Sequence, residues 1–594
     1  MSPTCREVVL SCGCVTDRRK LLAEVRRALH VEHVVLTLHD PSFPSRADEE
    51  TGRGSPYTRG AHDLYEWALD RGFTGIQLGP QGETGRTNPS PYDGTTFAKS
   101  VHSIAIWRLA HDPAFEGILS VATLEAIVAG APTATEHMDY AYVYDAHRRA
   151  VAEAYSRASR TGTLWARFAA FRAHAAAWLD RDAEYEAWTA EYGTEDWQRW
   201  PAEITDVVGD ELFAFGQFLV HAQHAALVAE TSRIGLRLFG DLQVGISYRD
   251  RFRRKDLFLP RYVMGAPPSR TNPEGQPWGY PVLCPGSASA LALLRMRATK
   301  MLEEFHGLRV DHPHGLVCPW VYDGTAADPM AAVNAGARLF ESPNLPDHPD
   351  LAPFAITRAE QLDPTHARYA DEWVTWLDAA QIDAYARQFE VVMEAAHAHG
   401  RSGNDILFEV LSTCPHPLEG VMRRYNLGRF RVTQKADPTR PSDGYLTANA
   451  EPGDWVMLGN HDTLPIWRVV PSWSSARIAA WQHYLAPRVG PVDVDRLPQA
   501  LFADLFASEA GNVSVFFADL FGCTDVYNAP GVVNEQNWRL RVGNDFAVTH
   551  ARRLAQGHAL DVPGAMASAL RATGHEEHVA LANRIEQLGR LDDA

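Results

Sequence analysis

The chain has 594 residues, of which 45% are apolar and 22% charged, the balance of a globular protein and not of a disordered one. Lys and Arg number 56 against 74 Asp and Glu, so the formal net charge is −18. Such a charge argues against nucleic acid or an anionic membrane as a partner, because both are bound through basic surface. An uncharged ligand is compatible with it.

The sequence shows no sorting signal and no cysteine pattern typical of disulfide bonds. No run reaches the roughly 18–20 consecutive apolar residues of a membrane span, and the N-terminus lacks the apolar segment and cleavage site of an export signal. Seven scattered cysteines, an odd number, do not make a disulfide framework. We therefore expect a cytoplasmic protein with reduced cysteines; its oligomeric state cannot be read from these features.

Short apolar runs, each ending near an acid or a turn, alternate along the chain with helical patterns. Runs of four to six mostly apolar residues that do not alternate are typical of buried parallel strands. Helical spacing recurs between them, at residues 61–71, 287–305 and 382–399. The strand-like runs are residues 34–38, 74–78, 236–240, 307–310, 405–408 and 455–459. This alternation predicts an α/β protein, and its length and strand-end acids favour a (β/α)₈ TIM barrel.

Two insertions and two terminal segments complete the expected organisation. We expect the barrel over residues 31–560, preceded by an N-terminal extension, residues 1–30, and followed by a C-terminal helical segment, residues 561–594. Residues 110–232, without a strand pattern in most of their length, form a mostly helical insertion. Residues 319–381, rich in Pro and Asp, form a loop-rich insertion near the cleft.

Four acids lie at the ends of predicted strands, where TIM barrels carry their catalytic groups. A single one, such as Asp241, is equally well explained by a salt bridge, but four on one face indicate a polar active site. Arg309 lies two residues before Asp311, on the same face of its strand, and keeps that carboxylate ionised as a nucleophile requires. Glu409 follows an apolar run that raises its pKa and suits a proton donor. Two carboxyls in opposed environments are what glycosidic bond cleavage uses.

The most specific motif of the sequence is APPSRTNPEGQPWGYP at residues 266–281. It resembles the APP…GQ-x-WG-x-P segment of the 4-α-glucanotransferases, glycoside hydrolase family 77. GLRVDH at residues 307–312 resembles the nucleophile strand of the wider α-amylase clan. Further blocks agree in order: LGP at 78–80 with SPY at 90–92, FGDL at 239–242, FE at 408–409, GNHDT at 459–463, and DLFG at 519–522 with NAPG at 528–531 and NWRLR at 537–541.

The resemblance implies a retaining double displacement on α-1,4-glucans. By motif, Asp311 is the nucleophile, Glu409 the acid and base, and Asp462 the residue that stabilises the transition state. His461 and Arg309 then hold the reacting sugar ring, on which Tyr92 stacks. Trp278 becomes an acceptor-side platform, and Asp241 hydrogen-bonds sugar hydroxyls. The carboxyls of Asp311 and Glu409 are expected about 5–5.5 Å apart, as in retaining enzymes.

Three departures from the family pattern leave the substrate open. Val410 follows the acid/base where the family usually has Asp, His314 stands near the nucleophile where it has Arg, and residues 82–89 form a longer loop. A retaining α-glucan hydrolase, or a transferase with another acceptor, is therefore the alternative enzyme. A glucan-binding protein with weakened catalysis is the alternative from another class. No P-loop, strand-linked GxGxxG or HExxH occurs, so we expect no cofactor and no metal site.

Overall fold

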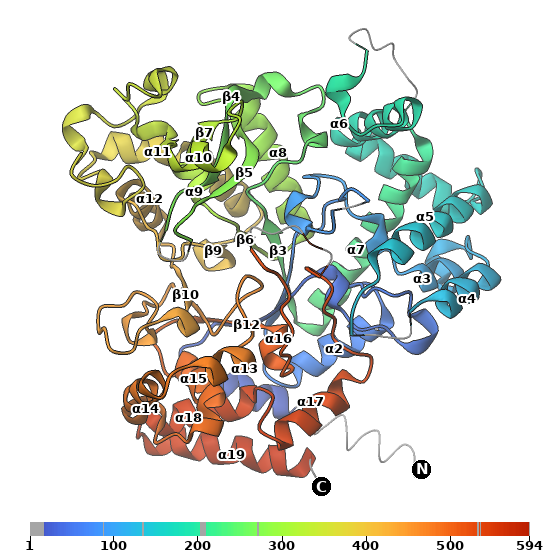
Figure 1. Ribbon diagram of the computed structural model, residues 1–594. Coiled ribbons are helices and arrows are strands. Elements are labelled where there is room, and N and C mark those ends of the chain that lie inside the picture. Colours follow the sequence, from blue (N-terminus) through green and yellow to red (C-terminus); the bar gives the residue numbers. More distant parts are fainter. Residues whose placement is uncertain are drawn as a thin grey trace, which may run out of the picture.

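Eight parallel strands close around one another at the centre of the protein, as the computed structural model shows (Figure 1). The order in the sheet is β10-β11-β12-β1-β2-β3-β6-β9, with β12 paired to β1. The amide of Phe430, which opens β10, donates to the carbonyl of Val410 just beyond β9, which brings the two ends of the sheet together. The strands are β1 His33–Leu38, β2 Gly75–Leu78, β3 Arg237–Leu242, β6 Gly307–Val310, β9 Ile406–Phe408, β10 Phe430–Val432, β11 Trp455–Met457 and β12 Asn512–Phe516.

The prediction of a (β/α)₈ barrel is confirmed, and each of the six predicted strands overlaps a barrel strand. The structure describes residues 17–86, 88–132, 136–201, 209–269, 272–530, 534 and 536–592. Part of the expected N-terminal extension, residues 1–16, lies outside these ranges. Every residue of β2, β6 and β12 is buried, which explains why these strands are mostly apolar.

Helices cover the outside of the barrel, and several begin at a side chain that caps them. Thr58 accepts a hydrogen bond from the Ala61 amide at the start of α2, and Ser287 caps α8 in the same way. Apart from α7 (Glu211–Ile234), the helices that follow or join barrel strands are α2 Arg59–Leu69, α8 Ala288–Glu304, α9 His314–Val317, α11 Ala379–Ala398, α12 His416–Tyr425, α13 Ile466–Val469, α14 Ser475–Val489, α15 Leu497–Phe506, α16 Phe517–Leu520, α17 Phe546–Ala555, α18 Val562–Ala572 and α19 Glu576–Asp592.

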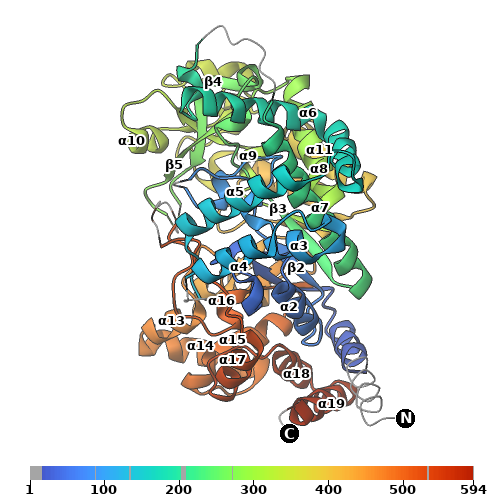
Figure 2. The same cartoon turned by 90° about the vertical axis from the view of Figure 1, so that its right-hand side faces the viewer.

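A helical layer lies between β2 and β3 in the sequence. It contains α3 Ile106–His111, α4 Val121–Gly130, α5 Tyr140–Arg157, α6 Thr163–Tyr192 and α7 Glu211–Ile234. Helix α7 contacts β3, while α5 and α6 pack on α7 (Figure 2). By length and hydropathy α7 could also cross a membrane, but 56% of its most apolar window is buried inside the protein. Its buried Gln217 and Gln223 hydrogen-bond the backbone of Lys99 and Ala105, which marks α7 as a core helix.

A second, antiparallel sheet stands beside the barrel and joins two segments that are distant in sequence. Its order is β5-β4-β7-β8, with β4 Phe258–Ala266, β5 Gln276–Leu283, β7 Trp320–Asp323 and β8 Ala337–Arg338. The expected loop-rich insertion at residues 319–381 thus supplies two strands and the helix α10 Pro329–Asn334. The two strands were not predicted, because β8 has only two residues and depends on β7 for its pairing.

Candidate active site

Strand register places Arg309 at the centre of the site. Asp241 in β3 pairs directly with Arg309 in β6, so the two side chains project on the same side of the sheet. The Nη1 atom of Arg309 lies 2.9 and 2.8 Å from the two carboxylate oxygens of Asp241 and 3.0 Å from Oδ1 of Asp311. Its Nη2 atom lies 2.5 Å from Oε1 of Glu409. One buried guanidinium therefore contacts three carboxyl groups.

The Asp311 carboxylate is held in its ionised form. Burial raises the pKa of Asp311, but the charge of Arg309 and the amide of Val244, which donates to Oδ2 over 3.2 Å, outweigh it and keep this pKa below its usual value. The side chain keeps 14% of its surface exposed, so a ligand can reach it. These are the requirements of a carboxylate nucleophile.

Glu409 has the opposite protonation. Burial raises the pKa of Glu409 to about 8 against the charge of Arg309, and the charges of Asp311 and Asp462 add to the rise. The backbone amide of His312 donates to Oε2 over 3.1 Å. His312 adopts a left-handed backbone conformation, with a φ of 39°, which is uncommon for a residue with a side chain. At neutral pH the Glu409 carboxyl carries a proton that it can donate.

Asp462 stands on the loop after β11 and is the most accessible of the three acids, with 39% of its side chain exposed. Asn528 donates to its Oδ1 over 2.7 Å, and the neighbouring His461 brings Nε2 to 3.4 Å from Oδ2. Burial lowers the pKa of His461 to about 3, so its ring is neutral. The electrostatic influence of Asp462 on Glu409, and of Asp311 on Asp462, links all three acids in one site.

Aromatic rings form the wall beside these acids. Tyr92 stacks on His461, with ring centroids 5.2 Å apart, and its hydroxyl donates to Asp241 over 3.0 Å. His39, at the end of β1, stacks on Tyr527 and meets the edge of His461 at 5.2 Å. Both ring nitrogens of His39 are buried without a hydrogen-bond partner among the described residues. The rings hold Tyr92 and His461 in fixed orientations.

Two predicted binding residues take different positions from the rest. Asp241 has no exposed side-chain surface, and Arg309 and Tyr92 occupy its carboxylate. These contacts position Arg309 and Tyr92, and the hydrogen bonds from Asp241 to sugar hydroxyls stay a prediction. Burial raises the pKa of Asp241 to about 7 despite the charge of Arg309. Trp278, on β5, is partly exposed and meets the edge of the His312 ring at 4.8 Å, next to the nucleophile strand.

The departures from the family pattern also find structural explanations. Val410 is fully buried, and its carbonyl accepts the hydrogen bond that closes the barrel. His314 stacks on His312 with centroids 4.6 Å apart, and its Nε2 bonds to the carbonyl of Thr413. Burial lowers the pKa values of both histidines, so this stack is uncharged. The family usually has a charged arginine at the position of His314.

Sequence reasoning missed four groups that shape the site. They are the Val244 and His312 amides, Asn528 and Asp519. Backbone amides leave no signature in a sequence. Asp519 and Asn528 do belong to the motifs DLFG and NAPG, and their place in these motifs is the signal that could have identified them. Asp519 Oδ1 accepts from the Ile466 amide over 2.7 Å, which ties down the loop that carries Asp462.

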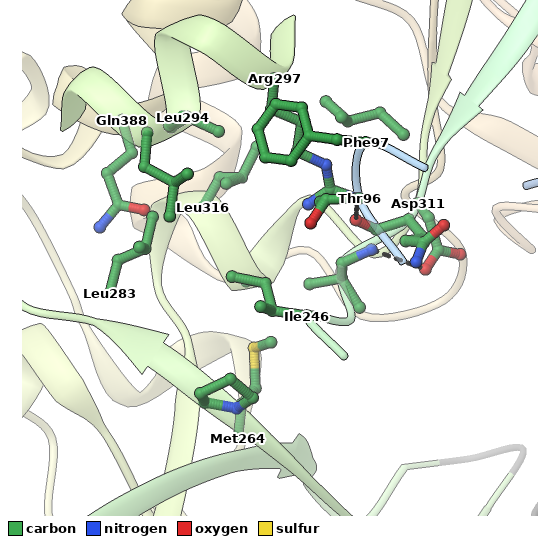
Figure 3. Close-up of a pocket in the computed structure, with 16 residues that line it drawn as sticks. Thr96, Phe97, Ile246, Met264, Leu283, Leu294, Arg297, Asp311, Leu316 and Gln388 are labelled. Atoms are coloured by element: carbon green, nitrogen blue, oxygen red, sulfur yellow. Dashed lines mark hydrogen bonds between the residues drawn. The ribbon is translucent and has the colours of Figure 1, made fainter. Parts of the chain in front are cut away.

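An apolar cavity of about 40 Å³ lies behind the nucleophile (Figure 3). Leu283, Met264, Ile246 and Leu316 line it, and Asp311 stands at its edge, where the Val244 amide holds the carboxylate. Within the described ranges, no three His, Cys, Asp or Glu side chains are arranged to hold a metal ion.

Comparison with known proteins identifies the same family as the motifs. Residues 41–545 match the family described as 4-alpha-glucanotransferase. The 4-alpha-glucanotransferase of Thermus thermophilus is 27% identical over 350 residues, which cover 52% of this chain and 64% of that protein. The enzyme of the same name from Mycobacterium tuberculosis (strain ATCC 25618 / H37Rv) is 26% identical over 430 residues, 66% of this chain and 54% of that protein. The chain thus spans less than two thirds of either relative.

Solved structures agree on the fold. An amylomaltase from Streptococcus agalactiae in complex with acarbose superposes with a TM-score of 0.68 at 17% identity, over 89% of this chain and 99% of that one. The amylomaltase from Corynebacterium glutamicum gives a TM-score of 0.65 at 16% identity, over 95% and 76% of the two chains. Since the family match extends over most of its length, this chain belongs to the 4-alpha-glucanotransferase family.

Proposed function

We propose that this protein transfers segments of α-1,4-glucan between malto-oligosaccharides by a retaining double displacement. The observation that carries the proposal is the opposed protonation of two carboxyls that share one guanidinium, with the pKa of Asp311 lowered and that of Glu409 raised to about 8. An ionised nucleophile beside a protonated acid is the pair that a retaining glycosidase needs, at a separation of about 5–5.5 Å.

In the first step a carboxylate oxygen of Asp311 attacks the anomeric carbon while Glu409 gives its proton to the glycosidic oxygen. The bond to that oxygen breaks, and the shortened glucan leaves with a free 4-hydroxyl. Asp462 stabilises the positive charge that develops on the sugar ring. Arg309 and His461 hold the same ring, which stacks on Tyr92. The product of this step is a glycosyl ester on Asp311.

In the second step an acceptor glucan, bound over Trp278, replaces the first product. Glu409, now ionised, takes the proton of the acceptor 4-hydroxyl as its oxygen attacks the anomeric carbon, and the Asp311 carboxylate is released. Two inversions leave the α configuration unchanged. Transfer prevails over hydrolysis if the acceptor occupies the site before water does.

Maltotriose as the single substrate tests the proposal. Longer oligomers together with glucose indicate transfer, whereas glucose and maltose without longer sugars indicate the alternative hydrolase. An unchanged substrate indicates the glucan-binding alternative and contradicts the proposal. The control is Asp311→Asn, which should abolish turnover while leaving glucan affinity nearly unchanged.

A further inference from the structure

An exposed aromatic pair lies outside the catalytic residues, at the end of the helical layer. Trp197, in the turn after α6, stacks on Tyr248, in the loop after β3, with ring centroids 5.3 Å apart and an interplanar angle of 30°. The indole N–H of Trp197 donates to the Tyr248 carbonyl over 3.0 Å, which fixes the pair. Tyr248 is 37% exposed and Trp197 is partly exposed.

Polar groups border these rings. The Tyr248 hydroxyl donates to Oδ1 of Asp196 over 2.5 Å, and Arg199 contacts the other oxygen of that carboxylate at 2.9 Å. A rigid aromatic face bordered by a carboxylate and a guanidinium suits a sugar, whose C–H face lies on the ring while its hydroxyls bond to the charged groups.

The pair is connected to the catalytic residues through a single loop. Val244, whose amide holds the nucleophile, lies four residues before Tyr248, so the extended chain between them spans at most about 14 Å. Gly245 packs so closely on the backbone of Tyr92 that an added Cβ would lie 2.9 Å from its carbonyl oxygen. A glucan that leaves the ring of Tyr92 therefore has the aromatic pair within reach.

The longer loop, of which the structure describes residues 82–86 and 88–89, approaches the turn that carries Trp197. Thr84 hydrogen-bonds the hydroxyl of Tyr140 over 3.0 Å, and an added Cβ on Gly85 would lie 3.4 Å from a carboxylate oxygen of Glu195. The loop leads into Tyr92, so it joins the donor side of the site to the turn that carries Trp197. This chain's departure from the family loop thus lies beside Glu195, two residues before Trp197.

We infer that Trp197 and Tyr248 form an additional glucan-binding subsite that takes the distal part of a long α-1,4-glucan. The inference rests on the proposed function for the identity of its ligand. A short donor fills the catalytic subsites alone, whereas a longer one also reaches the aromatic pair. The protein should therefore favour long glucans over maltotriose.

Calorimetric binding in the inactive Asp311→Asn protein tests this subsite without turnover. Adding Trp197→Ala should weaken the affinity for maltoheptaose about five- to tenfold, the value of one stacked aromatic contact, and leave the affinity for maltotriose unchanged. Tyr248→Phe keeps the ring and should bind maltoheptaose nearly as before. Trp376→Ala removes another exposed tryptophan, 46% accessible and before α11, and should change neither affinity.

Equal maltoheptaose affinity with and without Trp197 would overturn the inference, as would an equal loss for both sugars, which would mark Trp197 as structural. The wild-type reaction with maltotriose reports separately on the proposed function, since it needs no distal subsite. Failure of transfer and failure of the subsite therefore give different results.

Discussion

Arg309 brings Nη2 within 2.5 Å of Oε1 of Glu409, a carboxyl that nevertheless stays protonated at neutral pH. The same guanidinium lies 3.0 Å from Asp311, which stays ionised. Each carboxyl also accepts one backbone amide, from Val244 and His312. The difference arises because Glu409 is more deeply buried than Asp311, and the charges of Asp311 and Asp462 raise its pKa further. One cation thus supports two opposite protonation states.

Replacing Arg309 with Lys should lower kcat by about a hundred- to a thousandfold, the usual effect of removing one preorganised charge contact. The lysine keeps the positive charge but cannot contact Asp241, Asp311 and Glu409 at once, because it lacks the planar fork of donors. Steady-state kinetics with maltotriose measures the loss. Wild-type kcat in Arg309→Lys, with the fold intact by circular dichroism, would contradict the role of this cation.

The rate of the first step should fall on the alkaline side, with a midpoint near the Glu409 pKa of about 8. The acid form of Glu409 is needed for proton donation, and Asp311 is already ionised across the neutral range because its pKa is lowered. A pH profile of kcat/KM for maltotriose checks this. Glu409→Gln should lose about a hundred- to ten-thousandfold in rate, and its rate should not fall on the alkaline side. An alkaline fall in rate that persists in this variant would arise from another group.

Stability should change with pH in the opposite sense to an ordinary carboxylate. Folding raises the pKa of Glu409 from about 4.5 to about 8, so the folded protein binds more protons than the unfolded chain between these values. This group therefore makes the free energy of unfolding fall as pH rises from about 4.5 to 8. Thermal unfolding at pH 5 and pH 8 should show a smaller decrease in Glu409→Gln than in wild type; equal decreases would count against the raised pKa.

Asp519 should position Asp462 without touching a substrate. Its buried carboxylate accepts the Ile466 amide, and Asp519→Ala leaves that donor unpaired, at a cost of about 1–3 kcal/mol. The loosened loop should also lower kcat at least about tenfold, because small displacements of catalytic groups are costly. Asp519→Asn keeps an acceptor oxygen and serves as the matched control. If Asp519→Ala loses stability but keeps wild-type kcat, the carboxylate is structural only.

Gly79 should tolerate no side chain. An added Cβ would lie 1.6 Å from Cδ2 of His39, so Gly79→Ala must displace the His39 ring, which contacts His461. We expect a loss of about 1–3 kcal/mol in the free energy of unfolding, measured by denaturant titration. Gly444→Ala is the control, since nothing lies within 4 Å of its added Cβ and no loss is expected. Equal stability of the two variants would show that His39 can move away freely.

The repeating pattern of apolar runs was enough to predict the barrel. Strands such as β2 and β6 are buried along their whole length, and such burial favours mostly apolar residues, a pattern that the local sequence displays. Acids at the carboxyl ends of parallel strands must face one end of the barrel, so Asp311 and Glu409 could be placed together before any coordinates. The second sheet could not be predicted, because β4 and β7 pair across more than fifty residues of chain.

What the sequence by itself determined is the fold class, the family and the candidate acids, since each depends on residue type and local spacing. Only the tertiary structure decided how these groups behave. Asp241 turned out to contact Arg309 and Tyr92, and the pKa of Glu409 rises while that of Asp311 falls. Burial and the distance to Arg309 control these properties, and both arise from contacts between residues that lie far apart along the chain.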